Sequence, residues 1–228
     1  MSPSLLRTLA LSSFTVLALL LPLRAVPMMA DDDALLVDCE NPQTQMVMNI
    51  CAQQDWDASD RRLKQTYQTL QTELPTEAAR SLTTAQQQWL AFRDAECELE
   101  SSYAEGGSLQ PLLYSACAAT LTDQRNQDLT DYQQGRLPYG YGTDRDFEMV
   151  DRVLNQVYQA LQDSISDHRQ AELVAAELAW IEYQDAVCAF EQDFATRTDA
   201  SNDGAGQCPV RLTEQRIGQL IDYLAQYY

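Results

Sequence analysis

The sequence predicts an all-α protein made of two tandem antiparallel three-helix units, each clasped by a disulfide across a helical hairpin. Three observations support this prediction. The chain matches itself without gaps at an offset of 91 residues from Asp55 to Tyr132, which indicates an internal repeat. Apolar residues within each copy recur every three or four positions, the spacing of an amphipathic helix. Each copy also carries two cysteines 20 residues apart.

The first 30 residues have the composition of a secretory signal peptide. They contain no acidic residue, an early positive charge at Arg7, and a mostly apolar stretch from Leu9 to Leu23. We therefore expect residues 1–30 to direct export, with cleavage after Ala25 or Ala30. An uncleaved N-terminal anchor is the alternative. The mature protein would be periplasmic or secreted, without a membrane span.

The chain is strongly acidic. Its formal net charge is −19, and removal of Arg7 and Arg24 with the signal peptide would make it −21. Such a surface repels nucleic acid and anionic lipid and attracts basic proteins over long range. The sequence thus predicts a basic protein partner and argues against nucleic acid. The alternative is that the acidity only keeps an envelope protein in solution.

The first unit is expected to span residues 31–134. Leu63, Tyr67 and Leu70 follow helical spacing, and helix breaks are expected at Pro75 and at residues 106–108, which read Gly-Gly-Ser. We predict helices at about residues 43–73, 76–104 and 109–134.

A linker is expected at residues 135–143, which contain three glycines and Pro138. The second unit then covers residues 144–228. Its helices are predicted at about residues 144–165, 168–195 and 209–227, with a polar loop from Thr196 to Gln207. Each unit would fold as an antiparallel arrangement of three helices that bury one apolar stripe each.

Cysteine positions support the hairpins. Six cysteines in an exported chain suggest three disulfides, although six allow 15 pairings. Two helices that fold back at Gly106 would bring Cys97 and Cys117 to a similar height, and Cys188 and Cys208 repeat this spacing. We therefore expect the pairs Cys97–Cys117 and Cys188–Cys208.

The remaining cysteines, Cys39 and Cys51, have no counterpart in the second copy. They are expected to pair with each other and to fold the preceding segment back onto the first helix. A redox role is the alternative, but the sequence has no C-x-x-C motif and its cysteine spacings are wide.

The charged residues that both copies share include two pairs: Asp94 and Asp185, and Arg125 and Arg216. The hairpin geometry would place the aspartates and arginines on neighbouring helices. We interpret them as structural polar residues that anchor partly buried contacts and fix helix register. The alternative is a catalytic acid or base.

Motifs of known catalytic centres are absent from the sequence. Its single histidine, His168, excludes the usual histidine-based zinc sites, and no Gly-rich phosphate loop, G-x-S-x-G or H-E-x-x-H motif occurs. We predict no cofactor, no metal and no catalytic residue. A paired-carboxylate hydrolase is the alternative among enzymes.

Three ordered motifs resemble a known family. Residues 39–52 read CENPQTQMVMNICA and resemble the opening C-x-x-A-x-T-Q-x-E-M-N-x-C-A. Residues 89–97, WLAFRDAEC, resemble the centre W-x-x-[FY]-R-D-x-x-C, and residues 121–125, LTDQR, resemble the closing L-T-x-x-R. The chain thereby resembles the lysozyme inhibitor LprI-like family of bacterial envelope proteins. The second copy lacks the opening motif and has Gln184 where the family has arginine, so it is expected to be diverged.

The resemblance implies an exported helical protein, and the named member of the family inhibits lysozyme. Together with the acidic charge, it leads us to expect a non-enzymatic binding protein whose partner is a basic cell-wall hydrolase such as lysozyme. The alternative is a periplasmic scaffold or stress-related interaction protein without lysozyme activity. Function depends on the surface more than on the shared scaffold, so the fold transfers more safely than the activity.

Overall fold

The computed structural model describes residues 37–138, 146–198 and 207–225. The signal peptide expected at residues 1–30 lies outside these residues. So do residues 139–143 of the expected linker and residues 199–206 of the expected polar loop.

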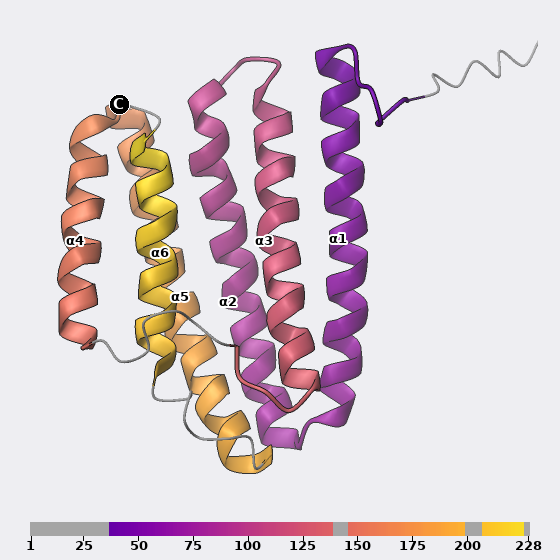
Figure 1. Ribbon diagram of the computed structural model, residues 1–228, viewed down its shortest axis with the longest axis vertical. Coiled ribbons are helices and arrows are strands. Elements are labelled where there is room, and N and C mark those ends of the chain that lie inside the picture. The colour runs from indigo at the N-terminus through magenta and orange to yellow at the C-terminus, as the bar shows by residue number, and fades with distance from the viewer. Residues whose placement is uncertain (1–36, 139–145, 199–206, 226–228) are drawn as a thin grey trace, which may run out of the picture. The chain divides into compact units, whose positions relative to one another are not determined.

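Helices account for most of the described chain, and no strand occurs in it. In chain order they are α1 (Gln45–Glu73), α2 (Thr76–Ser101) with the 3₁₀ turn η1 (Ser102–Ala104), α3 (Gln110–Gln133), α4 (Phe147–Ser164), α5 (Asp167–Thr198) and α6 (Cys208–Leu224) (Figure 1). The predicted all-α class is confirmed. The largest difference from the predicted bounds, three residues, is at the end of α5 and in the division of residues 76–104 into α2 and η1. Residues 144–145 and 226–227 of the predicted helices lie outside the described residues.

Local sequence sets several helix ends. The side chain of Thr44 accepts a hydrogen bond from the backbone N–H of Val47 at 3.2 Å and caps α1. Asp146 caps α4 in the same way through the N–H of Glu148 at 2.7 Å. Gly135 follows α3 with φ of 71°, a left-handed conformation that glycine adopts without strain.

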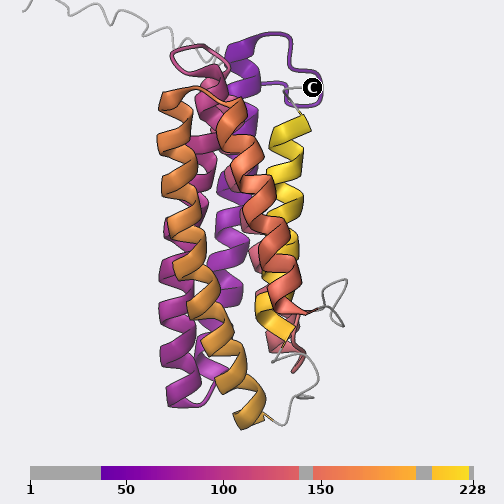
Figure 2. The same cartoon turned by 90° about the vertical axis from the view of Figure 1, so that its left-hand side faces the viewer.

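Three helix pairs make the most contacts: α1 with α3, α4 with α6, and α2 with α5, and α2 also packs on α3 (Figure 1 and Figure 2). The first two pairs each lie within one copy of the repeat, whereas the third joins the middle helices of the two copies. Helices α2 and α5 are antiparallel, because Arg169 near the start of α5 donates to Ser102 just after α2, at 3.1 Å. The rings of Phe92 and Tyr183 meet midway along both helices.

An approximate two-fold axis relates the two copies. Phe92 and Tyr183 are equivalent at the 91-residue offset, and their rings stack with centroids 5.6 Å apart and planes 4° apart. A residue meets its own counterpart only close to a two-fold axis. The buried apolar cluster runs through both copies, from Leu63 to Tyr223. The tandem repeat therefore folds around one shared core.

Three disulfides tie the helices together. Cys39 is bonded to Cys51, Cys97 to Cys117 and Cys188 to Cys208, with Cα atoms 5.5 Å apart in each pair. All three are the expected pairs. The second joins α2 to α3 and the third joins α5 to α6, so each copy is clasped across its own hairpin.

Among the described residues, no helix combines the length and the apolar character that crossing a membrane requires.

Candidate functional site

Arg216 on α6 is buried at the junction of the two copies, with none of its side chain exposed. Its Nη1 donates to Oε2 of Glu96 on α2 at 2.7 Å, and its Nε donates to Oε2 of Glu177 on α5 at 2.9 Å. Burial alone would lower the pKa of Arg216, but these two carboxylates raise it above its ordinary value. The guanidinium therefore stays charged and links the middle helices of both copies.

Arg125 on α3 is the equivalent of Arg216 and is equally buried, but it has poorer partners. Its Nε donates to Gln86 at 3.2 Å, and Asp128 lies 3.8 Å from its Nη1. Val187 occupies the position that Glu96 holds in the first copy. Within the described part of the chain, Nη1 and Nη2 of Arg125 donate no hydrogen bond. The two copies thus place the arginine in the same position, but the charged groups around it differ.

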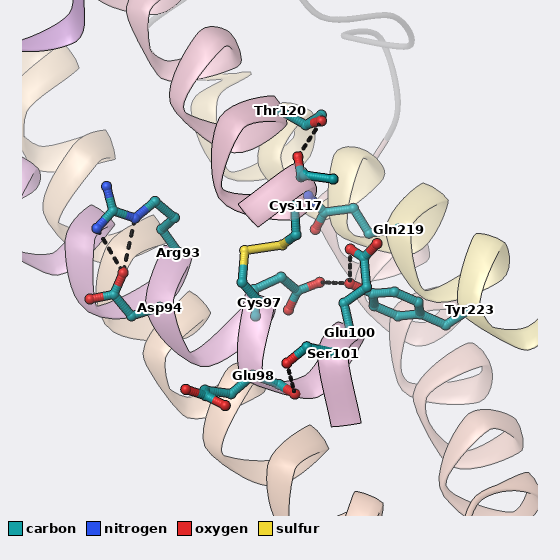
Figure 3. Close-up of a disulfide and its surroundings, with 12 residues drawn as sticks. Arg93, Asp94, Cys97, Glu98, Glu100, Ser101, Cys117, Thr120, Gln219 and Tyr223 are labelled. Carbon is teal, nitrogen blue, oxygen red and sulfur yellow. Dashed lines mark hydrogen bonds and ion pairs between the residues drawn. A yellow bond between two sulfur atoms is a disulfide. The ribbon is translucent and has the colours of Figure 1, made fainter. Parts of the chain in front are cut away.

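The two repeated aspartates lie elsewhere. Asp94 is exposed on α2 and accepts hydrogen bonds from its neighbour Arg93 at 2.7 and 2.9 Å (Figure 3). Asp185 is exposed on α5. The structure brings neither aspartate to Arg125 or Arg216. The strongest contacts of Arg216 are to two glutamates that the sequence reasoning did not single out.

An open pocket of about 320 Å³ lies between α2, α3 and α6, next to the Cys97–Cys117 disulfide (Figure 3). Its walls include three carboxylates, those of Glu96, Glu100 and Asp222. We call it the acidic pocket. Its volume is at the lower end of the range of small-molecule sites.

The carboxylates of the acidic pocket are unevenly neutralised. Glu96 is paired with Arg216, whereas Glu100 makes no ion pair with any residue that the structure describes. The Tyr223 hydroxyl lies 3.0 Å from Oε1 of Glu96 and 3.5 Å from Oε2 of Glu100 (Figure 3), so its one hydrogen can serve either. Burial and, secondly, the charge of Glu96 raise the pKa of Glu100, although the Tyr223 hydrogen bond opposes this.

The equivalent place in the second copy is filled by an arginine of the chain itself. Arg211 on α6 donates to Oε1 of Glu191, which is the counterpart of Glu100, and both side chains are buried. Tyr132, the counterpart of Tyr223, donates to the same oxygen at 2.6 Å. In the first copy, the position of Arg211 is occupied by the short side chain of Thr120.

The chemistry that the acidic pocket offers is cation binding. Its carboxylates line a cavity. The single histidine of the sequence, His168, lies outside this cavity at the start of α5, 3.2 Å from Glu105. Among the described residues, no group of three or more His, Cys, Asp or Glu side chains could hold a metal ion. Sequence reasoning missed this site, although Glu100 and Glu191 match at the repeat offset and could have marked it.

The raised pKa of Glu100 predicts a pH dependence of stability. A carboxyl whose pKa is higher in the folded state binds more protons there, so the free energy of unfolding falls as pH rises from about 4.5 through that raised pKa. In the variant Glu100→Gln, the free energy of unfolding should fall less over this pH range, and the variant should be at least as stable as the wild type at neutral pH. Urea unfolding across this pH range measures both.

The matched control is Glu98→Gln, which removes an exposed carboxylate from the same helix outside the pocket. Identical pH profiles for the wild type and Glu100→Gln would contradict the predicted role of Glu100.

Comparisons with known proteins identify a family, a relative of part of the chain and a solved structure of similar fold. The sequence model of the family described as lysozyme inhibitor LprI matches residues 39–129 and 141–220, one segment for each copy. An uncharacterised protein of Rhizobium meliloti is 34% identical to this chain, in a match that covers 42% of this chain and 79% of that protein. The crystal structure of an uncharacterised protein from Burkholderia thailandensis superposes with a TM-score of 0.55 and 19% identity, covering 80% of this chain and 88% of that one. The last likeness shows the fold alone.

Proposed function

Because this chain belongs to the lysozyme inhibitor LprI family, we propose that it is an exported, non-enzymatic protein that binds and inhibits a basic lysozyme or a related cell-wall hydrolase. The observation that carries this proposal is the family match to both copies of the repeat. The acidic pocket adds a place where a basic partner could be held.

Two features support export to the periplasm or beyond the cell. Residues 1–30 have the composition of a signal peptide. The three disulfides are typical of a protein that matures in an oxidising compartment. A cell-wall hydrolase is encountered in the same compartment.

The charge of the chain supports a basic partner. Without residues 1–30 the net charge would be −21, and lysozymes of the animal type are strongly basic. Opposite charges raise the rate of encounter, and the effect weakens as salt is added. Steering of this kind brings the partners together but does not by itself block a substrate cleft.

The test is lysozyme-driven lysis of bacterial cell walls with and without the oxidised mature protein, at low and at physiological salt. We expect inhibition at both, because a fitted contact survives a Debye length of about 8 Å whereas steering alone does not. No inhibition, or inhibition only at low salt, would contradict the proposal and favour an acidic scaffold. The reduced protein is the control for the contribution of the disulfides.

A further inference from the structure

The internal repeat indicates which ligand the acidic pocket fits. Most of the residues that line the pocket have counterparts around Arg211 in the second copy, among them Glu100 and Glu191, and Tyr223 and Tyr132. Six of the ten lining residues are identical in the two copies, and the other four stand opposite different residues: Glu96 opposite Val187, Ala116 opposite Gln207, Thr120 opposite Arg211 and Gln219 opposite Asp128. Only the change at Thr120 removes a cation. The fold therefore forms two equivalent sites, each with a glutamate and a tyrosine, and a side chain of the protein itself occupies only the second.

The filled place shows how a guanidinium is held. Arg211 enters from the helix that carries the second cysteine of the clasp, passes within 3.8 Å of Cys208 Sγ and pairs with Glu191. Glu191 is 1% exposed, so its charge is stabilised almost wholly by Arg211 and by the Tyr132 hydroxyl. A buried carboxylate requires such a cation.

The acidic pocket has the glutamate, Glu100, but no counterpart of the Arg211 guanidinium to pair with it. Glu100 lies on α2 with the Tyr223 hydroxyl beside it, and Asp222 at the exposed rim adds a further negative charge. Thr120 turns its hydroxyl back to the carbonyl of Ala116 at 2.9 Å (Figure 3), so it does not enter the pocket as a cation would. Planar guanidinium groups match carboxylates with paired hydrogen bonds, which ammonium groups do not.

We propose that the acidic pocket receives an arginine side chain of a basic protein partner, in the place that Arg211 fills in the second copy. That the partner is a lysozyme rests on the proposed function. The chemistry of the pocket does not rest on it. The two can therefore be tested separately.

The first experiment measures the pocket alone. Mature wild-type protein is titrated with L-arginine methyl ester and with L-citrulline methyl ester, which differ in the charged guanidinium, and binding is followed by NMR shifts of the Glu100 and Thr120 amides. We expect the arginine ester to bind at least about tenfold more tightly, the factor of one charge-assisted hydrogen bond. Equal binding of the two esters would overturn the proposal.

The decisive variant is Thr120→Arg, which should fill the first pocket from within as Arg211 fills the second. We expect this variant not to bind the arginine ester. Its melting temperature should rise by about 2–4 °C because Glu100 gains a cationic partner. Thr69→Arg adds the same charge at an exposed site of α1 and is the matched control. Undiminished ester binding by a folded Thr120→Arg would overturn the proposal.

A second variant, Glu100→Gln, removes the negative charge of the carboxylate without adding bulk, and it keeps the test decisive if Thr120→Arg does not fold. We expect it to weaken binding of the arginine ester at least about tenfold, and unchanged binding would overturn the proposal.

The same variants are then compared for binding to an animal-type lysozyme. A loss of at least about tenfold in Thr120→Arg relative to Thr69→Arg would support the partner's arginine in the pocket. Equal affinities of these two variants would overturn it while leaving the proposed inhibition intact. If the wild type does not bind lysozyme at all, the proposed function fails, and the two esters still decide whether the pocket takes a guanidinium.

Discussion

Replacing Arg216 with methionine is expected to lower the free energy of unfolding by about 3–5 kcal/mol, because the change removes one partner of a buried ion pair. Glu96 is 2% exposed and has no other cation among the described residues. Glu177 would lose its partner as well. Urea unfolding of the oxidised mature protein at neutral pH measures the effect.

Two variants serve as controls for this result. Arg62→Met breaks the Arg62–Asp123 pair, whose side chains are each 54% exposed, and should cost no more than about 1 kcal/mol. Arg125→Met removes the equivalent buried arginine, whose one ion pair among the described residues is with Asp128 at 3.8 Å, and should cost less than Arg216→Met. A cost for Arg216→Met as small as that for Arg62→Met would mean that the junction does not depend on this cation.

The helices were predictable from sequence because their causes are local. Helical spacing, Pro75 and the glycines at residues 106 and 135 act within a few residues, and the structure breaks its helices there. Disulfide partners followed from the same reasoning, since a hairpin of known turn fixes which cysteines reach each other. Both inferences need only neighbours in the chain.

The packing of α2 on α5 was not predictable in this way. The 91-residue offset shows which residues correspond, but it does not show which faces meet. Phe92 and Tyr183 are aromatic at equivalent positions, and helical spacing alone places each of them in the core of its own unit. In the structure they stack on each other across the two-fold axis. Burial of both middle helices against each other completes a core that neither copy forms alone.

The acidic pocket was missed for a related reason. Residues identical in both copies attracted attention, yet identity does not separate exposed Asp94 and Asp185 from buried Arg125 and Arg216. The informative positions are those at which the copies differ. Thr120 opens a place that Arg211 closes in the other copy. Because the two copies are related by a two-fold axis, one such substitution leaves one site open and the equivalent site occupied.

Removing the Cys97–Cys117 disulfide by alanine substitution of both residues is expected to lower the free energy of unfolding by about 3 kcal/mol, the value for a closed loop of 20 residues. Removing Cys188–Cys208, whose loop has the same length, should cost a similar amount. We expect the joined helices to stay folded without their bridges, so that the constraint is lost only from the unfolded chain. Urea unfolding of each double variant measures the cost.

The Cys39–Cys51 pair should behave differently, and the comparison tests this reasoning. Its loop is shorter by only eight residues, so loop entropy alone predicts nearly the same cost. However, Cys39 and the segment that precedes α1 are mostly exposed, and this segment can detach locally once the bridge is gone. The global cost should then be less than half that of Cys97–Cys117, with faster hydrogen exchange near residues 45–51. Equal global costs would mean that the segment stays docked without its disulfide.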